Sequence, residues 1–181
     1  MSSLRRALLA ALVPVVALLV AAPAAPAGAA RPEPSVHAKV GIPRTYDAAL
    51  QHFGNAPGRE RTYKKFVTPS GNIYCAVKMT GYPTGCEINA GAVKDPDVCP
   101  GNPVSDRVGR IEFHRGRAVP VCNTDTIRTP GAKTLRYGDI AHIPGWHYAC
   151  LSEEIGVTCI NENKAEGFFL HRGEYVIFNA G

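Results

Sequence analysis

Apolar and polar residues alternate in short runs along most of the chain after residue 62. The segment Trp146–Cys150 has the period-two pattern of a strand with one buried face, and this alternation places Trp146 on the core side with Cys150. Similar runs predict strands at 63–67, 72–79, 86–88, 110–113, 117–122, 146–150, 157–160, 168–170 and 175–178. There is no sustained 3.6-residue period and no fixed-length repeat. The pattern predicts an all-β domain, a small sandwich or barrel of short antiparallel strands.

The stretch Phe66–Cys75 (F-V-T-P-S-G-N-I-Y-C) predicts the first corner of this domain. It contains a strand end, a tight turn at Pro69-Ser70-Gly71 and a second strand that carries a cysteine into the core. Proline fixes φ for the first central position of a turn, and glycine accepts the positive φ that often follows.

The N-terminus has the three parts of a secretory signal. Arg5 and Arg6 precede an apolar run from Ala7 to Val20, and a Pro/Ala-rich end follows. We predict a signal peptide at 1–29, cleaved after the A-G-A triplet 27–29. An uncleaved anchor would need about 20 helix-compatible apolar residues, and Pro14, Pro23 and Pro26 interrupt a stretch of that length.

Residues 30–61 are rich in proline, glycine and charge, and we predict a flexible, extended spacer there. Tyr46–Phe53 could form a helix of two turns, with Thr45 as N-cap and Gly54 at the end. So short a helix is marginal unless it docks on something. The predicted β domain covers 62–181.

Six cysteines lie in the part of the chain predicted to be exported: Cys75, Cys86, Cys99, Cys122, Cys150 and Cys159. Outside the cytosol an even number predicts disulfides, and no C-x-x-C pair points to zinc. Six cysteines allow fifteen connectivities. The predicted hairpins favour the pairs 75–86, 99–122 and 150–159, and we expect the fold to fail on reduction.

The charge gives no footprint for nucleic acid. The formal net charge is +5, and loss of Arg5 and Arg6 with the signal peptide lowers the basic count from 20 to 18 against 15 acids, or +3. Nucleic-acid binding calls for a clustered patch. The basic stretches 59–65 and 107–117 are more typical of solvated hairpin tips than of a site for an anionic polymer. No membrane partner is expected after cleavage of the signal.

Candidate catalytic groups have simpler structural interpretations. Ser70 lacks the G-x-S-x-G elbow and suits a turn. Glu153, Glu154, Asp125 and Asp139 are the carboxylates considered for sugar hydrolysis. Glu153 and Glu154 are adjacent in a predicted turn, which suits neither a general acid of raised pKa nor a flanking base.

A metal site would need histidines that the sequence does not group. His142 and His147 could be joined by His114, His171 or Asp139, but Pro144 and Gly145 prevent a helical spacing between the first two. We therefore predict no metal and no cofactor, and favour a protein that is not an enzyme.

Four residues form the candidate binding site: Tyr137, Trp146, His147 and Tyr148. An exposed aromatic platform here could stack on sugar rings or on a protein partner. The alternation described above instead favours a core position for Trp146.

These motifs resemble a family of uncharacterised secreted proteins of Gram-positive, actinobacterial type. The family pattern is an opening F-x-[ST]-P-S-G-N-I-x-C with six cysteines, an L-x-Y-G step, a C-x-S…G-V-T-C hairpin and a closing G-F-x-L-S-R. The corresponding segments here are 66–75, 135–138, 150–152 with 156–159, and 167–172. His171 replaces the usual Ser, and Glu166 stands where His is common. The resemblance implies the fold, the compartment and cysteines paired in sequence order.

Together these patterns predict an exported, disulfide-stabilised β module that is secreted or associated with the cell envelope. We expect it to act by binding an envelope polymer or an extracellular protein. Two alternatives remain. One is an envelope hydrolase that uses histidine and carboxylate groups from the strand-end loops, and the other is a secreted inhibitor or effector.

Overall fold

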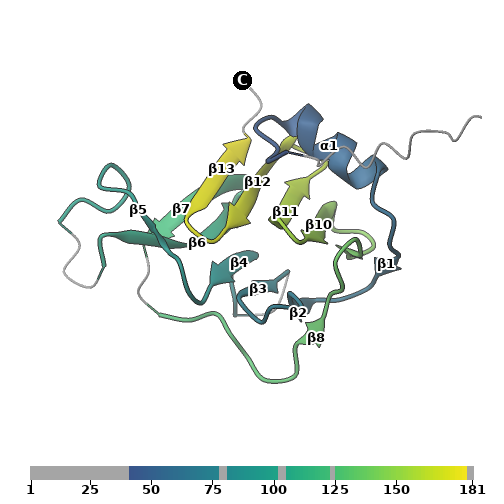
Figure 1. The fold of residues 1–181 in the computed structure, drawn as a ribbon, viewed down its shortest axis with the longest axis horizontal. Helices are drawn as coiled ribbons and strands as arrows, with labels where there is room; N and C mark the ends of the chain where they lie inside the picture. Colours follow the sequence, from purple (N-terminus) through teal and green to yellow (C-terminus); the bar gives the residue numbers. More distant parts are fainter. Residues whose placement is uncertain (1–40, 78–80, 102–104, 123–124, 179–181) are drawn as a thin grey trace, which may run out of the picture. The chain divides into compact units, whose positions relative to one another are not determined.

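The computed structural model describes residues 41–77, 81–101, 105–122 and 125–178. The predicted signal peptide and residues 30–40 of the predicted spacer lie outside the described residues. Within them the chain forms one short helix and two β-sheets (Figure 1). The predicted all-β, disulfide-bonded sandwich is therefore confirmed.

The first sheet, sheet A, has six strands in the spatial order β1 (Glu60–Arg61), β9 (Ile140–His142), β10 (Tyr148–Glu153), β11 (Gly156–Asn161), β12 (Glu166–His171) and β13 (Glu174–Phe178). Sheet B has the order β5 (Val93–Lys94), β6 (Arg107–His114), β4 (Gly85–Ile88), β3 (Ile73–Ala76), β2 (Lys65–Val67) and β8 (Lys133–Thr134), and β7 (Arg117–Cys122) also pairs with β6. All described pairings are antiparallel except β1 with β9 and β2 with β8.

The two sheets repeat one pattern of strand pairing. The chain passes in order through β3, β4, β6 and β7 in sheet B, and through β10, β11, β12 and β13 in sheet A. In both, a disulfide hairpin comes first, and the second cysteine lies opposite Ile111 in sheet B and Phe168 in sheet A. The turns His114-Arg-Gly116 and His171-Arg-Gly173 then fall at the same point of the register.

The repeat has no fixed length because its loops differ. Residues 89–106 connect β4 to β6 and include β5, whereas only 162–165 connect β11 to β12. The two halves of the chain, divided at residue 131, also exchange edge strands. β1 precedes β2 in the chain but pairs with β9 in sheet A, while β8 precedes β9 but pairs with β2 in sheet B.

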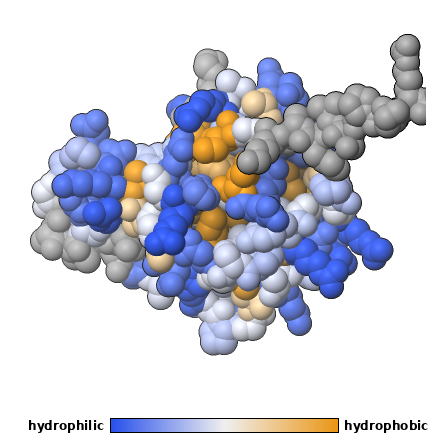
Figure 2. All heavy atoms as spheres, in the orientation of Figure 1, coloured by the Kyte–Doolittle hydropathy of each residue, from blue (hydrophilic) through white to orange (hydrophobic). Residues whose placement is uncertain are grey.

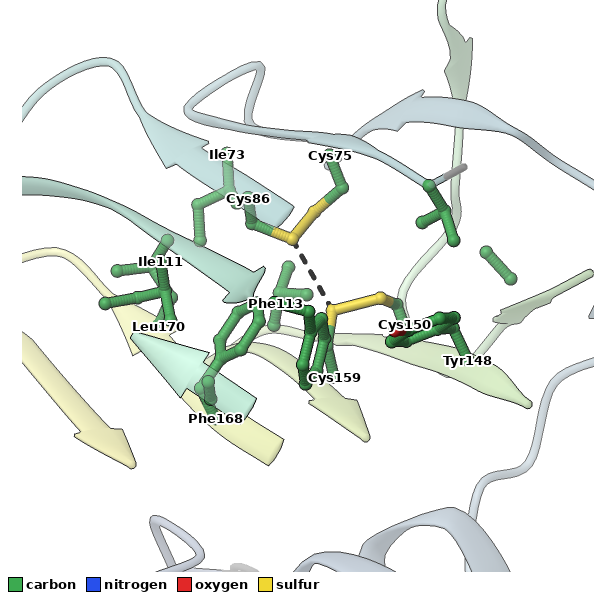
Figure 3. Close-up of a cluster of buried hydrophobic side chains, with 14 of the residues drawn as sticks. Ile73, Cys75, Cys86, Ile111, Phe113, Tyr148, Cys150, Cys159, Phe168 and Leu170 are labelled. Atoms are coloured by element: carbon green, nitrogen blue, oxygen red, sulfur yellow. Dashed lines mark hydrogen bonds between the residues drawn. A yellow bond between two sulfur atoms is a disulfide. The ribbon is translucent and has the colours of Figure 1, made fainter. Parts of the chain in front are cut away.

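The main core lies between the sheets and is built around two disulfides (Figure 3). The disulfides join Cys75 to Cys86, Cys99 to Cys122 and Cys150 to Cys159, which are the pairs that the predicted hairpins favoured. The first and third connect residues directly opposite each other on neighbouring strands. Their sulfurs meet in the core, where Cys86 Sγ lies 3.5 Å from Cys159 Sγ.

Helix α1 (Tyr46–Gly54) forms where the sequence predicts it, but it docks on the domain. The Thr45 side chain accepts a hydrogen bond from the Ala48 N–H as N-cap. Ala49 is fully buried in a second apolar cluster with residues of sheet A, including Ile160 and Phe169. This packing stabilises a helix too short to persist alone. The folded unit therefore begins earlier in the chain than residue 62.

Hydrophobic residues on the face shown in Figure 2 gather over the β11 and β12 region, with hydrophilic residues around them. In the part of the chain that the structure describes, no helix is long and apolar enough to cross a membrane.

Candidate functional site

A surface cavity of about 330 Å³, here called cleft 1, lies where three loops of the domain meet. The β6–β7 turn contributes Arg115 and Gly116. The turn before β10 and the first residue of that strand contribute Gly145–Tyr148. The last residue of β11, Asn161, and the loop after it complete the lining with Asn163 and Lys164.

The segment before β10 turns Trp146 toward solvent. Pro144 and Gly145 occupy the centre of a turn that the Trp146 N–H closes on the Ile143 carbonyl at 3.1 Å, and Gly145 has φ +80°. His147 then has φ +52°, which interrupts the extended backbone before the strand begins at Tyr148. Trp146 is 49% exposed as a result. The predicted core position is wrong because the alternation does not extend through this turn.

The β6–β7 hairpin contributes Arg115 to cleft 1. Arg115 and Gly116 both have positive φ, +52° and +92°, as a two-residue type I′ turn requires. Buried Asn161 donates from Nδ2 to the Gly116 carbonyl at 3.0 Å. A Cβ on residue 116 would lie 2.8 Å from that nitrogen, so glycine permits the close approach.

Non-glycine residues with left-handed backbone gather around cleft 1. Among the described residues, the non-glycine positions with positive φ are Arg115, His147 and Ala165. The first two line the cleft, and Ala165 follows Lys164 in the third loop. Such conformations cost about 1–3 kcal/mol each and cluster at functional sites.

Packed aromatic rings form the base of cleft 1 and connect it to the core. The Phe113 ring centroid lies 4.9 Å from that of Tyr148 and 5.3 Å from that of Phe168. Burial raises the pKa of Tyr148, so its phenol is neutral at physiological pH. Packing between these rings holds the floor in one arrangement.

The charge on the walls has one sign. Arg115 and Lys164 line cleft 1 and are exposed, and exposed His147 lines it as well. No carboxylate is among the described residues that line it. The cleft thus combines an exposed indole, amide donors and two permanent cations.

Three of the four predicted binding residues meet in cleft 1, and the fourth does not. Tyr137 is 39% exposed in another cavity, cleft 2, with Glu153, Glu154, His171 and Arg172. Arg115 was noted only as part of the basic stretch 107–117, and Asn161 and Lys164 were not predicted as site residues. The Arg-Gly pair between two predicted strands was the only local signal, since the contribution of the β11–β12 loop depends on tertiary packing.

The tip of the basic stretch 107–117 is solvated, because Arg107, Arg115 and Arg117 are exposed. Arg110 differs, since it is buried and paired with buried Glu112 within sheet B. Phe113, Arg115 and Gly116, near the end of the stretch, line the cleft.

Most carboxylates considered for hydrolysis are engaged in structural contacts. Asp139 accepts from the Arg59 N–H at 2.8 Å and from Arg61 Nε at 3.0 Å. Glu153 is paired with His52, with 2.9 Å between Oε2 and Nδ1. Asp125 lies 3.4 Å from Arg110 Nη1.

The candidate metal ligands and nucleophile are also dispersed. His114 pairs with Glu112, while His147 and His171 line different clefts. Among the described residues, the one group of three potential ligands is Cys75, Cys86 and Cys159, whose sulfurs are in disulfides. Ser70 Oγ accepts from the Asn72 N–H within its turn, 3.3 Å away.

Comparison with known proteins identified no matching family model, no matching curated protein and no matching solved structure.

Proposed function

We propose that the chain is an exported binding module whose cleft 1 holds a short segment of an anionic carbohydrate, such as a uronic-acid polymer of a cell envelope. Export is supported by the signal-like N-terminus and by three disulfides, which persist in oxidising compartments. The proposal depends on one observation: the exposed face of Trp146 shares a cleft with Arg115 and Lys164, and no described lining residue is acidic.

Each part of cleft 1 has a role toward such a ligand. The indole offers a flat apolar surface to a sugar ring, and the exposed amide of Asn163 can bond its hydroxyls. The guanidinium of Arg115 can pair with a carboxylate through two parallel hydrogen bonds. Because both cations are solvated, each should contribute less than about 1 kcal/mol, so the aromatic contact carries most of the affinity.

The emission of Trp146 provides a direct test, since it is the only tryptophan of the chain. We expect oligomers of galacturonic acid to shift and protect this emission, and neutral cello-oligomers of equal length to do so much less. Binding of the acidic oligomer should weaken as salt rises.

Variants assign the binding to cleft 1, with calorimetry as the readout. Trp146→Ala should weaken binding about 30-fold, equivalent to about 2 kcal/mol, and the double variant Arg115→Gln with Lys164→Gln about tenfold. Lys133→Gln, which removes an exposed charge outside the cleft, is the matched control. Equal binding of acidic and neutral oligomers, or full affinity in the Trp146 variant, would refute the proposal.

A further inference from the structure

A second cavity, cleft 2, has a volume of about 400 Å³ and is also built from loops of both sheets. The turn before β3 contributes Ser70 and Asn72, the β10–β11 turn contributes Glu153 and Glu154, and the β12–β13 turn contributes His171 and Arg172. Tyr137 completes the wall.

Cleft 2 is the counterpart of cleft 1 in the repeated pattern of strand pairing. The H-R-G turn places Arg115 in cleft 1 and Arg172 in cleft 2. In each cleft, the segment that leads into the disulfide hairpin also lines the cavity. Ile73 of β3 and Tyr148 of β10 occupy equivalent positions, because each precedes the first cysteine of its hairpin by two residues. Each cleft therefore joins the H-R-G turn of one half to the proline-containing turn of the other.

The side chains on this shared framework differ in charge. Cleft 1 has cations and no carboxylate among its described lining residues, whereas cleft 2 has two glutamates and one arginine. Arg172 passes beside Gly91: a Cβ there would lie 2.2 Å from Arg172 Cγ, and the Gly173 N–H donates to the Gly91 carbonyl. These contacts fix the position of the H-R-G turn against the β4–β5 segment.

The two glutamates have different environments. Both carboxylate oxygens of Glu153 lie within 3.1 Å of His52 Nδ1 on helix α1, which orients this side chain. Glu154 is exposed at the tip of the turn. Tyr137 presents an aromatic ring that is 39% exposed, and the Ser70 hydroxyl also lines the cleft. The Asn72 side chain is bonded at both ends to the Ala90 backbone, so it fixes the wall of the cleft.

We propose that cleft 2 is a second binding site, for a sugar that carries a primary ammonium group. Tyr137 stacks on the sugar ring, Glu154 pairs with the ammonium, and the Ser70 hydroxyl bonds a ring hydroxyl. The proposal does not depend on the ligand of cleft 1, because the lining residues of the two clefts do not overlap.

The test compares two tetramers that differ in one group per ring: β-1,4-linked glucosamine and its N-acetylated form. Calorimetry should show binding of the amine and at least tenfold weaker binding of the acetamide, whose nitrogen carries no charge. Glu154→Gln should weaken binding of the amine tetramer about fivefold, and Tyr137→Ala about tenfold. Glu162→Gln, another exposed glutamate outside cleft 2, should leave it unchanged.

Exchange of the ligands separates this site from cleft 1. Trp146→Ala should retain affinity for the amine tetramer, and Glu154→Gln should retain affinity for galacturonic acid oligomers. The proposal is overturned if neither tetramer binds, if both bind equally, or if affinity for the amine is lost in the Trp146 variant instead of the Glu154 and Tyr137 variants.

Discussion

Asp139 shows how one buried charge connects distant parts of the chain. It lies just before β9 and accepts hydrogen bonds from the Arg59 N–H and the Arg61 side chain, at the point where β1 joins sheet A. These two bonds, the backbone bond first, hold the pKa of Asp139 below its usual value although burial opposes them. The sequence marked Asp139 only as a candidate carboxylate for hydrolysis or metal binding, because its structural partners lie about 80 residues away.

The lowered pKa gives a pH dependence of defined sign. In the unfolded chain the Asp139 carboxyl has a pKa of about 4. The contribution of ionised Asp139 to the free energy of unfolding is therefore complete above pH 4 and is lost as the pH falls through its lower pKa in the folded state. We expect Asp139→Asn to lower the unfolding free energy by about 1–3 kcal/mol at pH 7. The reason is that an asparagine side chain accepts hydrogen bonds from the Arg59 N–H and the Arg61 guanidinium less strongly than a carboxylate does. Below pH 4 the difference from the native chain should shrink.

Urea unfolding between pH 2.5 and 7 measures this dependence. Asp97→Asn replaces an exposed carboxylate of the β5–β6 loop and serves as the control, with little change expected at pH 7. A constant difference between the Asp139 variant and the native chain at every pH would show that the carboxylate charge is not responsible.

At the scale of single elements, hairpins were predictable and short edge strands were not. Each disulfide hairpin has two apolar strands around a turn, so residue spacing alone indicates which cysteines face each other. By contrast, β1, β5 and β8 have two residues each, too few for a pattern. The partners of β1 and β8, β9 and β2, are also distant in sequence. Trp146 was misassigned for a related reason: a period-two pattern does not show where the strand begins, and that boundary depends on His147 adopting positive φ.

The two core disulfides are close enough for an alternative connection between the sheets. Cys86 Sγ lies 3.5 Å from Cys159 Sγ, and a disulfide needs about 2.05 Å (Figure 3). In the variant Cys75→Ala with Cys150→Ala, we expect Cys86 and Cys159 to form a new disulfide under mild oxidation. The new bridge would close a longer loop than either native bridge does. Its own loop-entropy contribution to the free energy of unfolding should be about 4 kcal/mol, more than that of either native bridge alone.

Peptide mapping without reduction detects the new bridge as a linked pair of peptides. The matched control is Cys86→Ala with Cys159→Ala, which loses the same number of native bridges but removes the closest sulfur pair. We expect it to retain two free thiols and to unfold at lower urea. Free Cys86 and Cys159 in an otherwise folded, oxidised first variant would contradict the prediction.

At the scale of the whole molecule, the two halves depend on each other. Each sheet buries one face in the shared core, and each takes an edge strand from the other half, through β1 and β8. The described disulfides all connect residues within one half: two before residue 131 and one after it. The class of fold and its corners were predictable from local patterns, but this exchange is a long-range property without a local signature.

The exchange predicts that fragments 41–131 and 132–181 do not fold separately but fold together when mixed. Each oxidised fragment alone would expose the inner face of its sheet and lack one edge strand, so we expect no cooperative urea transition. An equimolar mixture should show one, with a shift in the emission of Trp146, which lies in the second fragment. Fragments 41–134 and 135–181 form the matched control. In that pair β8 stays with β2, so fewer strand pairings join the fragments and the dissociation constant should rise. A fragment that unfolds cooperatively as a monomer, or equal dissociation constants for the two pairs, would show that the exchanged strands do not hold the halves together.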